Sequence, residues 1–173
     1  MSITAGRSKI CDNVPGGLKT VWLSGVNEVT SFTLTGESYS AVTMEASNVF
    51  YKFEFEQTSA QKIEEGTQAD ALSPFGITQT LEFSFKGLSQ TDRDALSELI
   101  DCSPCGMIAI VEDTNGVMWV LGYNEDLGKE YGLFVSSITS DTGKLLTDFA
   151  GSIITLSASQ TELARTFTGT VPE

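Results

Sequence analysis

The central part of the chain, residues 76–123, carries the patterns that most restrict the fold. Apolar and polar side chains alternate through residues 78–86, so Leu81, Phe83 and Phe85 share one face. A period of two is typical of a strand that buries one face and leaves the other in water. A half-buried sheet is therefore predicted here.

A helix and a hairpin are predicted directly after this strand. Ser89 suits the N-cap of a helix over about residues 89–102, in which apolar residues recur at helical spacing. Two apolar runs, residues 107–112 and 117–122, then flank Asn115-Gly116, which is the strongest short signal for a β-hairpin. Strand, helix and hairpin form the predicted frame of the fold.

The flanking sequence adds further short strands separated by turn formers. In residues 49–56 the aromatic side chains of Tyr51, Phe53 and Phe55 alternate with charged ones, which predicts an antiparallel strand with its aromatic face packed. Other strands are predicted at residues 19–25, 39–45, 131–139 and 149–157. The predicted fold class is mainly β, an antiparallel β sandwich or partly closed barrel with one flanking α-helix.

A length of 173 residues suits one domain with a core of its own. We expect an N-terminal arm at residues 1–18, a single β-rich domain at 19–159 and a C-terminal tail at 160–173. The polar stretch 57–75 is interpreted as a long exposed loop, although residues 60–64 are also compatible with an extension of the preceding strand.

The charge balance is strongly acidic, with 23 acids, 10 bases and a net charge of −13. Such a surface repels phosphate, which disfavours binding to nucleic acid and to anionic membranes. Two interpretations stay open: ordinary acidic solubility, and a surface that DNA slides past without sticking. Because no apolar run approaches about 20 residues and no signal peptide is evident, we expect a chain that stays in the cytoplasm until it assembles.

Catalytic chemistry has little support in the sequence. The chain contains no histidine, so the usual general base, nucleophile pairs and commonest zinc ligand are missing. Cys102 and Cys105 have C-x-x-C spacing but follow the predicted helix, at the pole that does not activate a thiol. We expect small buried thiols there and predict no enzyme, no metal site and no cofactor; Asp113 to Gly116 lacks the further ligands of a calcium loop.

The order of features resembles that of small structural proteins encoded by tailed phages and prophages of Bacteroidetes, including the crAss-like group. The resemblance extends over about residues 11–157. The segments that carry it are residues 11–18, 53–60, 81–85, 88–99, 110–116, 121–122 and 148–156.

The resemblance implies a virion protein with the tail-tube type of fold, made in the bacterial host cytoplasm. Copies would close into homo-oligomeric rings of a tail tube or neck and contact other tail, neck or portal-proximal proteins. DNA would pass through an acidic conduit during ejection without specific binding. The arm before Trp22 and the loop 57–75 would contact neighbouring subunits. The candidate lumen acids are Glu54, Glu56, Glu64, Glu65 and Glu82.

Two other functions remain as alternatives. A β-sandwich binding module, on a virion or a cell surface, would recognise carbohydrate or protein through its loops, but the loops contain few aromatic residues. An enzyme that uses carboxylates is the third interpretation, and the absence of histidine counts against it.

Overall fold

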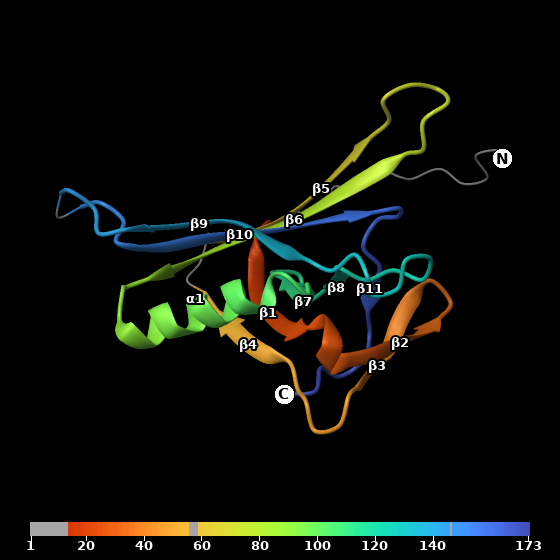
Figure 1. Cartoon of the computed structure of the whole chain (residues 1–173), viewed down its shortest axis with the longest axis horizontal. Coiled ribbons are helices and arrows are strands. Elements are labelled where there is room, and N and C mark those ends of the chain that lie inside the picture. Colours follow the sequence, from red (N-terminus) through yellow and green to blue (C-terminus); the bar gives the residue numbers. More distant parts are fainter. Residues whose placement is uncertain (1–13, 56–58, 146) are drawn as a thin grey trace.

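Two β-sheets and one helix make up the residues that the computed structural model describes, 14–55, 59–145 and 147–173 (Figure 1). Strands account for 51% of the chain and helix for 10%, which confirms the mainly β prediction. The sheets do not close into a barrel, so the sandwich is the correct one of the two predicted architectures.

The larger sheet has seven strands in the order β2, β3, β11, β8, β7, β1 and β4. Neighbouring strands are antiparallel except β3 and β11, which are parallel. A short 3-10 helix, η1 (Val26–Glu28), joins β1 to β2. The strands are β1 (Leu18–Gly25), β2 (Val29–Thr35), β3 (Ser38–Met44), β4 (Tyr51–Glu54), β7 (Met107–Asp113), β8 (Met118–Leu121) and β11 (Thr166–Phe167).

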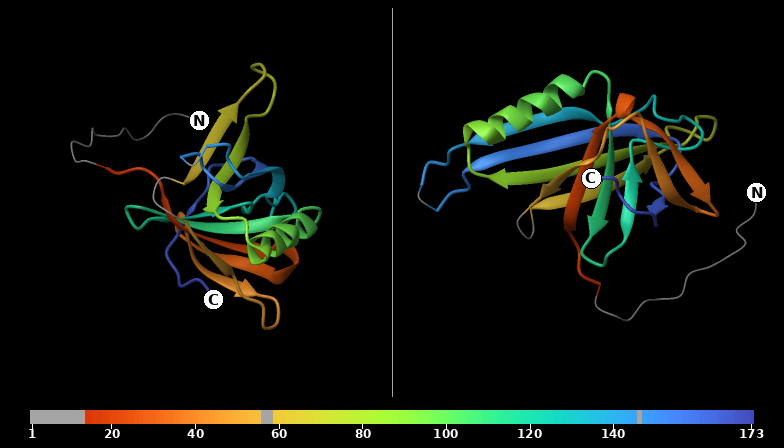
Figure 2. Two further views of the ribbon diagram at one scale, coloured as in Figure 1. Left: turned by 90° about the vertical axis from the view of Figure 1, so that its left-hand side faces the viewer. Right: turned by 90° about the horizontal axis from the view of Figure 1, so that it is seen from below.

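The smaller sheet has four antiparallel strands in the order β5, β6, β10 and β9. Its strands are β5 (Ala60–Thr67), β6 (Gly76–Lys86), β9 (Phe134–Asp141) and β10 (Gly151–Gln160). The β5–β6 and β9–β10 hairpins extend from opposite ends of the molecule along its long axis (Figures 1 and 2).

The core lies between the two sheets. Leu81 and Phe83 of β6, together with Leu156 of β10, pack in one buried cluster with Val21 of β1 and Val111 of β7. Leu81 and Phe83 occupy the alternating positions that predicted a half-buried strand, so that prediction is confirmed. A second buried cluster covers the opposite face of the seven-stranded sheet. Strands β1 and β7 are therefore buried on both faces.

Helix α1 (Gln90–Cys102) begins as predicted. The hydroxyl of Ser89 accepts a hydrogen bond from the backbone N–H of Asp92, and the Asp92 carboxylate accepts one from the N–H of Ser89 at 3.1 Å. Leu96 and Leu99 are buried against the core, whereas Ile100 is 51% exposed, so the predicted apolar face is narrower than expected. The predicted β7–β8 hairpin around Asn115-Gly116 is also present.

The interpretation of residues 57–75 as a long exposed loop, with residues 60–64 as a possible extension of the preceding strand, is wrong. Residues 60–67 form β5, which pairs with β6 along its whole length and belongs to a different sheet from β4. Only residues 68–75 connect the two strands, and residues 56–58 lie outside the described part. A separate strand was not predicted here because two of its inward-facing side chains, Lys62 and Glu64, are charged, so apolar and polar residues do not alternate.

Two further expectations are corrected. Tyr51 is 63% exposed and not packed, because it lies at the end of the edge strand β4, beside α1 rather than under the four-stranded sheet. The stretch 160–173 is not a free tail. Its strand β11 joins the seven-stranded sheet, Phe167 is buried, and the indole Nε1 of Trp22 donates to Glu173 at 2.6 Å.

Replacing Leu81 by Ala should lower the free energy of unfolding by about 2–5 kcal/mol, because it opens a cavity between the sheets. Leu72→Ala is the matched control, since Leu72 is 97% exposed and Leu81 is 0% exposed. The control should stay within about 0.5 kcal/mol of the parent chain. Urea unfolding followed by circular dichroism measures both; equal effects would contradict this account of the core.

Candidate functional site

The outer face of the four-stranded sheet is dominated by hydroxyl side chains. Along β6, β9 and β10 these alternate with the residues that face the core, and none of them is buried. Three apolar residues, Ile63, Phe134 and Ile153, interrupt the pattern. We call this surface the hydroxyl face; its hydroxyl residues include Thr78, Thr80, Ser84, Ser137, Thr139, Thr155, Ser157 and Ser159.

The charges on the hydroxyl face are mainly acidic. Glu65, Glu82 and Asp141 project from it, with Lys86 as the lysine on β6. The Nε2 of Gln61 on β5 donates to Oε1 of Glu82 at 3.1 Å. A surface of hydroxyls and carboxylates offers hydrogen bonds to water while repelling phosphate.

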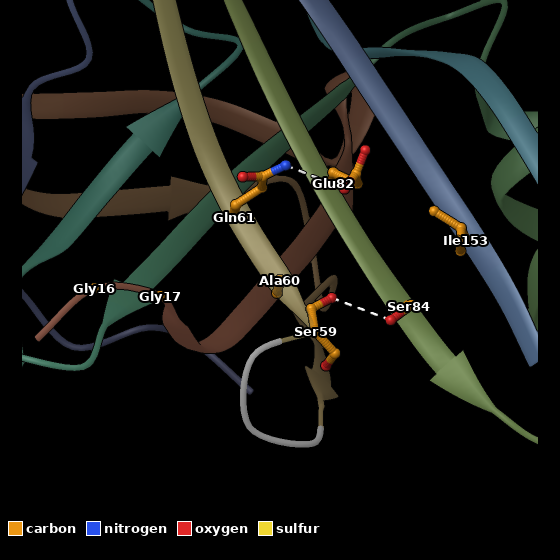
Figure 3. Close-up of a pocket in the computed structure, with 8 residues that line it drawn as sticks. All are labelled: Gly16, Gly17, Ser59, Ala60, Gln61, Glu82, Ser84 and Ile153. Atoms are coloured by element: carbon orange, nitrogen blue, oxygen red, sulfur yellow. Dashed lines mark hydrogen bonds between the residues drawn. The ribbon is translucent and has the colours of Figure 1, made fainter. Parts of the chain in front are cut away.

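A shallow pocket of about 430 Å³ lies where the hydroxyl face meets Gly16 and Gly17 (Figure 3). At the edge of the pocket, the hydroxyl of Ser84 donates a hydrogen bond to the backbone carbonyl of Ser59 at 3.3 Å. Glu82 is the titratable side chain among the described residues that line it. The side chains of Gln61, Glu82 and Ser84 in this lining offer hydrogen-bonding groups.

The predicted lumen acids do not share one surface. Glu65 and Glu82 lie on the hydroxyl face, whereas Glu54 lies on β4 of the other sheet. Glu54 is 74% exposed and pairs with Lys52 at 2.8 Å; that hydrogen bond, and then the lysine's charge, lower the pKa of Glu54. Glu56 lies outside the described residues.

Glu64 is a structural residue, and the expectation that it is exposed is wrong. Its side chain is 12% exposed, forms an ion pair with Lys62 and accepts a hydrogen bond from the backbone N–H of Ala164 at 2.6 Å. The Nζ of Lys62 lies 4.4 Å from the centroid of the Trp119 ring, a cation–π distance. These contacts connect β5 to the seven-stranded sheet and to the segment before β11.

The outermost strands of the four-stranded sheet, β5 and β9, each have a hydrogen-bonded strand neighbour on one side only within the described residues. An edge strand of this kind presents backbone N–H and C=O groups that another strand can pair with. Near its start β9 is covered, since the N–H of Val135 donates to the hydroxyl of Ser103 at 2.9 Å. The remainder of β9 extends beyond this contact.

An aspartate shapes the loop of each extended hairpin and leaves a leucine exposed. In the β5–β6 loop, the Asp70 carboxylate accepts from the N–H groups of Leu72 and Ser73, both at 2.8 Å, and Leu72 is 97% exposed. In the β9–β10 loop, the Asp148 carboxylate accepts from the N–H of Leu145 at 2.7 Å, and Leu145 is 66% exposed. Neither Asp70 nor Asp148 was predicted to shape a turn, although aspartate is a residue that favours turns.

The thiols of Cys102 and Cys105 are free and exposed, so the expectation of buried thiols is wrong. Partial burial, and then the nearby carboxylates, with Glu28 first among them, raise the pKa of the Cys102 thiol, which disfavours the reactive thiolate. Cys11 lies outside the described residues. In the described ranges, no cluster of three or more cysteine or acidic residues is arranged to hold a metal ion.

No protein-family model matches this sequence, and no significant similarity to a curated protein was found. The helix that the structure describes lacks the length and apolar character needed to cross a bilayer.

The loop aspartates should titrate below the ordinary aspartate pKa of about 3.9. Hydrogen bonds from backbone N–H groups lower the pKa of both Asp70 and Asp148, and the Ser73 hydroxyl adds to this at Asp70. Because the pKa of each aspartate is lower in the folded chain than in the unfolded chain, its carboxylate stabilises the loop at pH values above the unfolded pKa. This stabilisation is lost as the pH falls through the folded pKa.

Carboxyl ¹³C NMR across an acid titration measures both midpoints. Ser73→Ala should raise the Asp70 midpoint and leave the Asp148 midpoint unchanged. Midpoints at or above about 3.9 in the parent chain would show that the turns are not formed in solution.

Proposed function

We propose that this chain is a structural subunit of a tailed-phage virion, which assembles with copies of itself into rings of the tail tube or neck. The observation that carries the proposal is the four-stranded sheet, with one face in the core, a polar hydroxyl face on the outside and an edge strand at each side. The proposal rests also on the resemblance in the order of sequence features.

Ring formation follows from pairing between copies at these edges. Strand β5 of one copy would lie beside β9 of the next and continue the hydrogen-bonded sheet. Such a contact joins two different surfaces, so repeated copies close into a ring when the rotation between them permits it. Closure would cover the edge strands, which otherwise favour aggregation.

The hydroxyl face would then line the interior. Its acids, Glu65, Glu82 and Asp141, would repel the phosphates of passing DNA, and its hydroxyls would hold water. Of the five candidate lumen acids, this proposal retains Glu65 and Glu82. It assigns Glu54 and Glu64 to other parts of the subunit, because they lie away from this face.

The two extended hairpins would make contacts beyond the edge pairing. Each has apolar side chains in or beside its loop, including Leu72 and Phe75 at one end and Leu145 and Phe149 at the other. Exposed apolar side chains on protruding loops lose water when a neighbour covers them, which stabilises the assembly.

The alternative is a β-sandwich binding module for carbohydrate or protein, and carbohydrate binding would need an available aromatic platform. The candidate is Trp119, which lines a pocket of about 410 Å³ together with Asp113 and Asn115. Lys62 already lies over the Trp119 ring, so this platform is partly occupied by the protein itself. Binding to a glycan array, with loss in Trp119→Ala, would favour the alternative.

The purified chain should form rings or tubes at high concentration, visible by negative-stain microscopy and measurable as mass by light scattering. Leu72→Asp should raise the concentration needed for assembly at least tenfold, because it places a charge in an apolar contact. Leu163→Asp is the control, since Leu163 is also an exposed leucine but lies outside both hairpin loops. A parent chain that stays monomeric at millimolar concentration would contradict the proposal.

A further inference from the structure

A groove of about 520 Å³ separates α1 from the strands β1 and β4. Figure 1 shows the helix beside β4 at this edge of the seven-stranded sheet. Its floor is apolar and consists of Leu23, Phe53, Leu99 and Met107. An apolar groove beside a helix is a form of site that accepts an extended or helical peptide.

The rim of the groove is acidic. Glu98 and Asp101 are exposed on α1, one turn apart, and Glu28 contributes from η1 on the other side. The Glu28 carboxylate is held in place, since it accepts from the Ser24 hydroxyl at 2.8 Å and from the N–H of Gly25 at 3.0 Å.

The positive charge that lines the groove is already paired. Lys52 forms an ion pair with Glu54 at 2.8 Å. Burial is the first cause of the raised pKa of the Cys102 thiol, and the nearby carboxylates of Glu28, Asp101 and Glu98 add to it. The groove therefore suits a partner that is both basic and apolar.

The first thirteen residues of this chain have that composition. They contain Arg7 and Lys9, with Ile3 and Ile10 as apolar residues and Asp12 as their acid. Two bases against one acid give this segment a formal side-chain charge of +1, in a protein whose net charge is −13. Its charge and its apolar residues complement the rim and the floor of the groove.

The geometry favours the groove of a neighbouring copy over that of the same chain. The carbonyl of Pro15 accepts from the Thr114 hydroxyl and from Asn115 Nδ2, both at 3.1 Å, which fixes it at the end of β7 opposite to Met107. Strand β7 is about 20 Å long, at about 3.3 Å per residue. Lys9 lies six residues before Pro15, so a fully straight chain of about 20 Å would bring it to the near end of its own groove, with Arg7 two residues farther along. Binding within the same chain would therefore require the segment to be fully extended.

We propose that residues 1–13 of one copy bind the acidic groove between α1 and β4 of a neighbouring copy, with Arg7 and Lys9 facing Glu98 and Asp101. This inference rests on the proposed self-association and identifies one of its contacts. In a ring or a stack of rings, each subunit would hold the next by this segment.

The test uses the full-length chain carrying Arg7→Glu and Lys9→Glu, whose own segment no longer complements the groove. A fluorescent synthetic peptide of residues 1–13 is titrated with this protein, and binding is followed by anisotropy. We expect saturable binding that weakens at least tenfold when Glu98→Gln and Asp101→Asn are added. The charge-matched control, Glu65→Gln with Asp141→Asn on the hydroxyl face, should leave the affinity unchanged.

Absence of binding, or equal weakening by the groove variant and the control, would overturn the inference. Circular dichroism of each variant verifies that the fold is kept. Because the peptide is added in trans to unassembled chain, this result is independent of ring formation. Rings without peptide binding would therefore overturn this inference alone, and peptide binding without rings would overturn the proposed function alone.

A second measurement separates neighbour from self. Unlabelled and ¹⁵N-labelled parent chains are mixed and treated with a carbodiimide, which joins an amine directly to a carboxylate. Mass spectrometry should find Lys9 joined to Glu98 or Asp101 in pairs of mixed isotope content, and Lys9→Arg should abolish them. Pairs of uniform isotope content only would place the segment in its own groove and overturn the assignment to a neighbour.

Discussion

The structure depends on a four-stranded sheet that is packed on one face only. Leu81, Phe83 and Leu156 are fully buried against β1 and β7, and burial of each such side chain contributes about 1.5–3 kcal/mol. The opposite face carries mainly hydroxyl side chains, so covering it with an apolar layer would add little hydrophobic stabilisation. This asymmetry fixes which surfaces are available to a partner: the hydroxyl face, two edge strands and the loops of two hairpins.

Buried polar contacts hold this sheet in one position against the larger one. The side-chain oxygen of Gln79, which is 1% exposed, accepts a hydrogen bond from the N–H of Gly122 at 3.0 Å. Gly122 has a φ of +77°, and a Cβ there would lie 2.7 Å from the Met107 carbonyl, so glycine is required at this position. Because a buried donor or acceptor is costly to leave unpaired, sliding one sheet over the other is disfavoured. The edges and the loops are thereby presented in a fixed arrangement.

Sequence patterns predicted the elements whose local chemistry and burial agree. The alternation around Leu81, the cap at Ser89 and the Asn115-Gly116 hairpin each have a local cause, and each is present. Strand β5 was not predicted as a separate strand, because Lys62 and Glu64 face inward and contact Trp119 and Ala164, which lie far away in the sequence. The prediction of the lumen acids failed for a similar reason. Alternation along a strand indicates which acids are exposed, but it does not show which strands share a sheet. Glu54 and Glu64 were therefore grouped with Glu65 and Glu82.

In the proposed assembly, copies pair through the edge strands β5 and β9 of the four-stranded sheet. Hydrogen–deuterium exchange of the backbone amides, compared between dilute and concentrated protein, tests it most directly. If copies pair in this way, protection in β5 and β9 rises with protein concentration, while protection in the doubly buried strand β7 stays the same. Protection in β5 and β9 that is independent of concentration would contradict it.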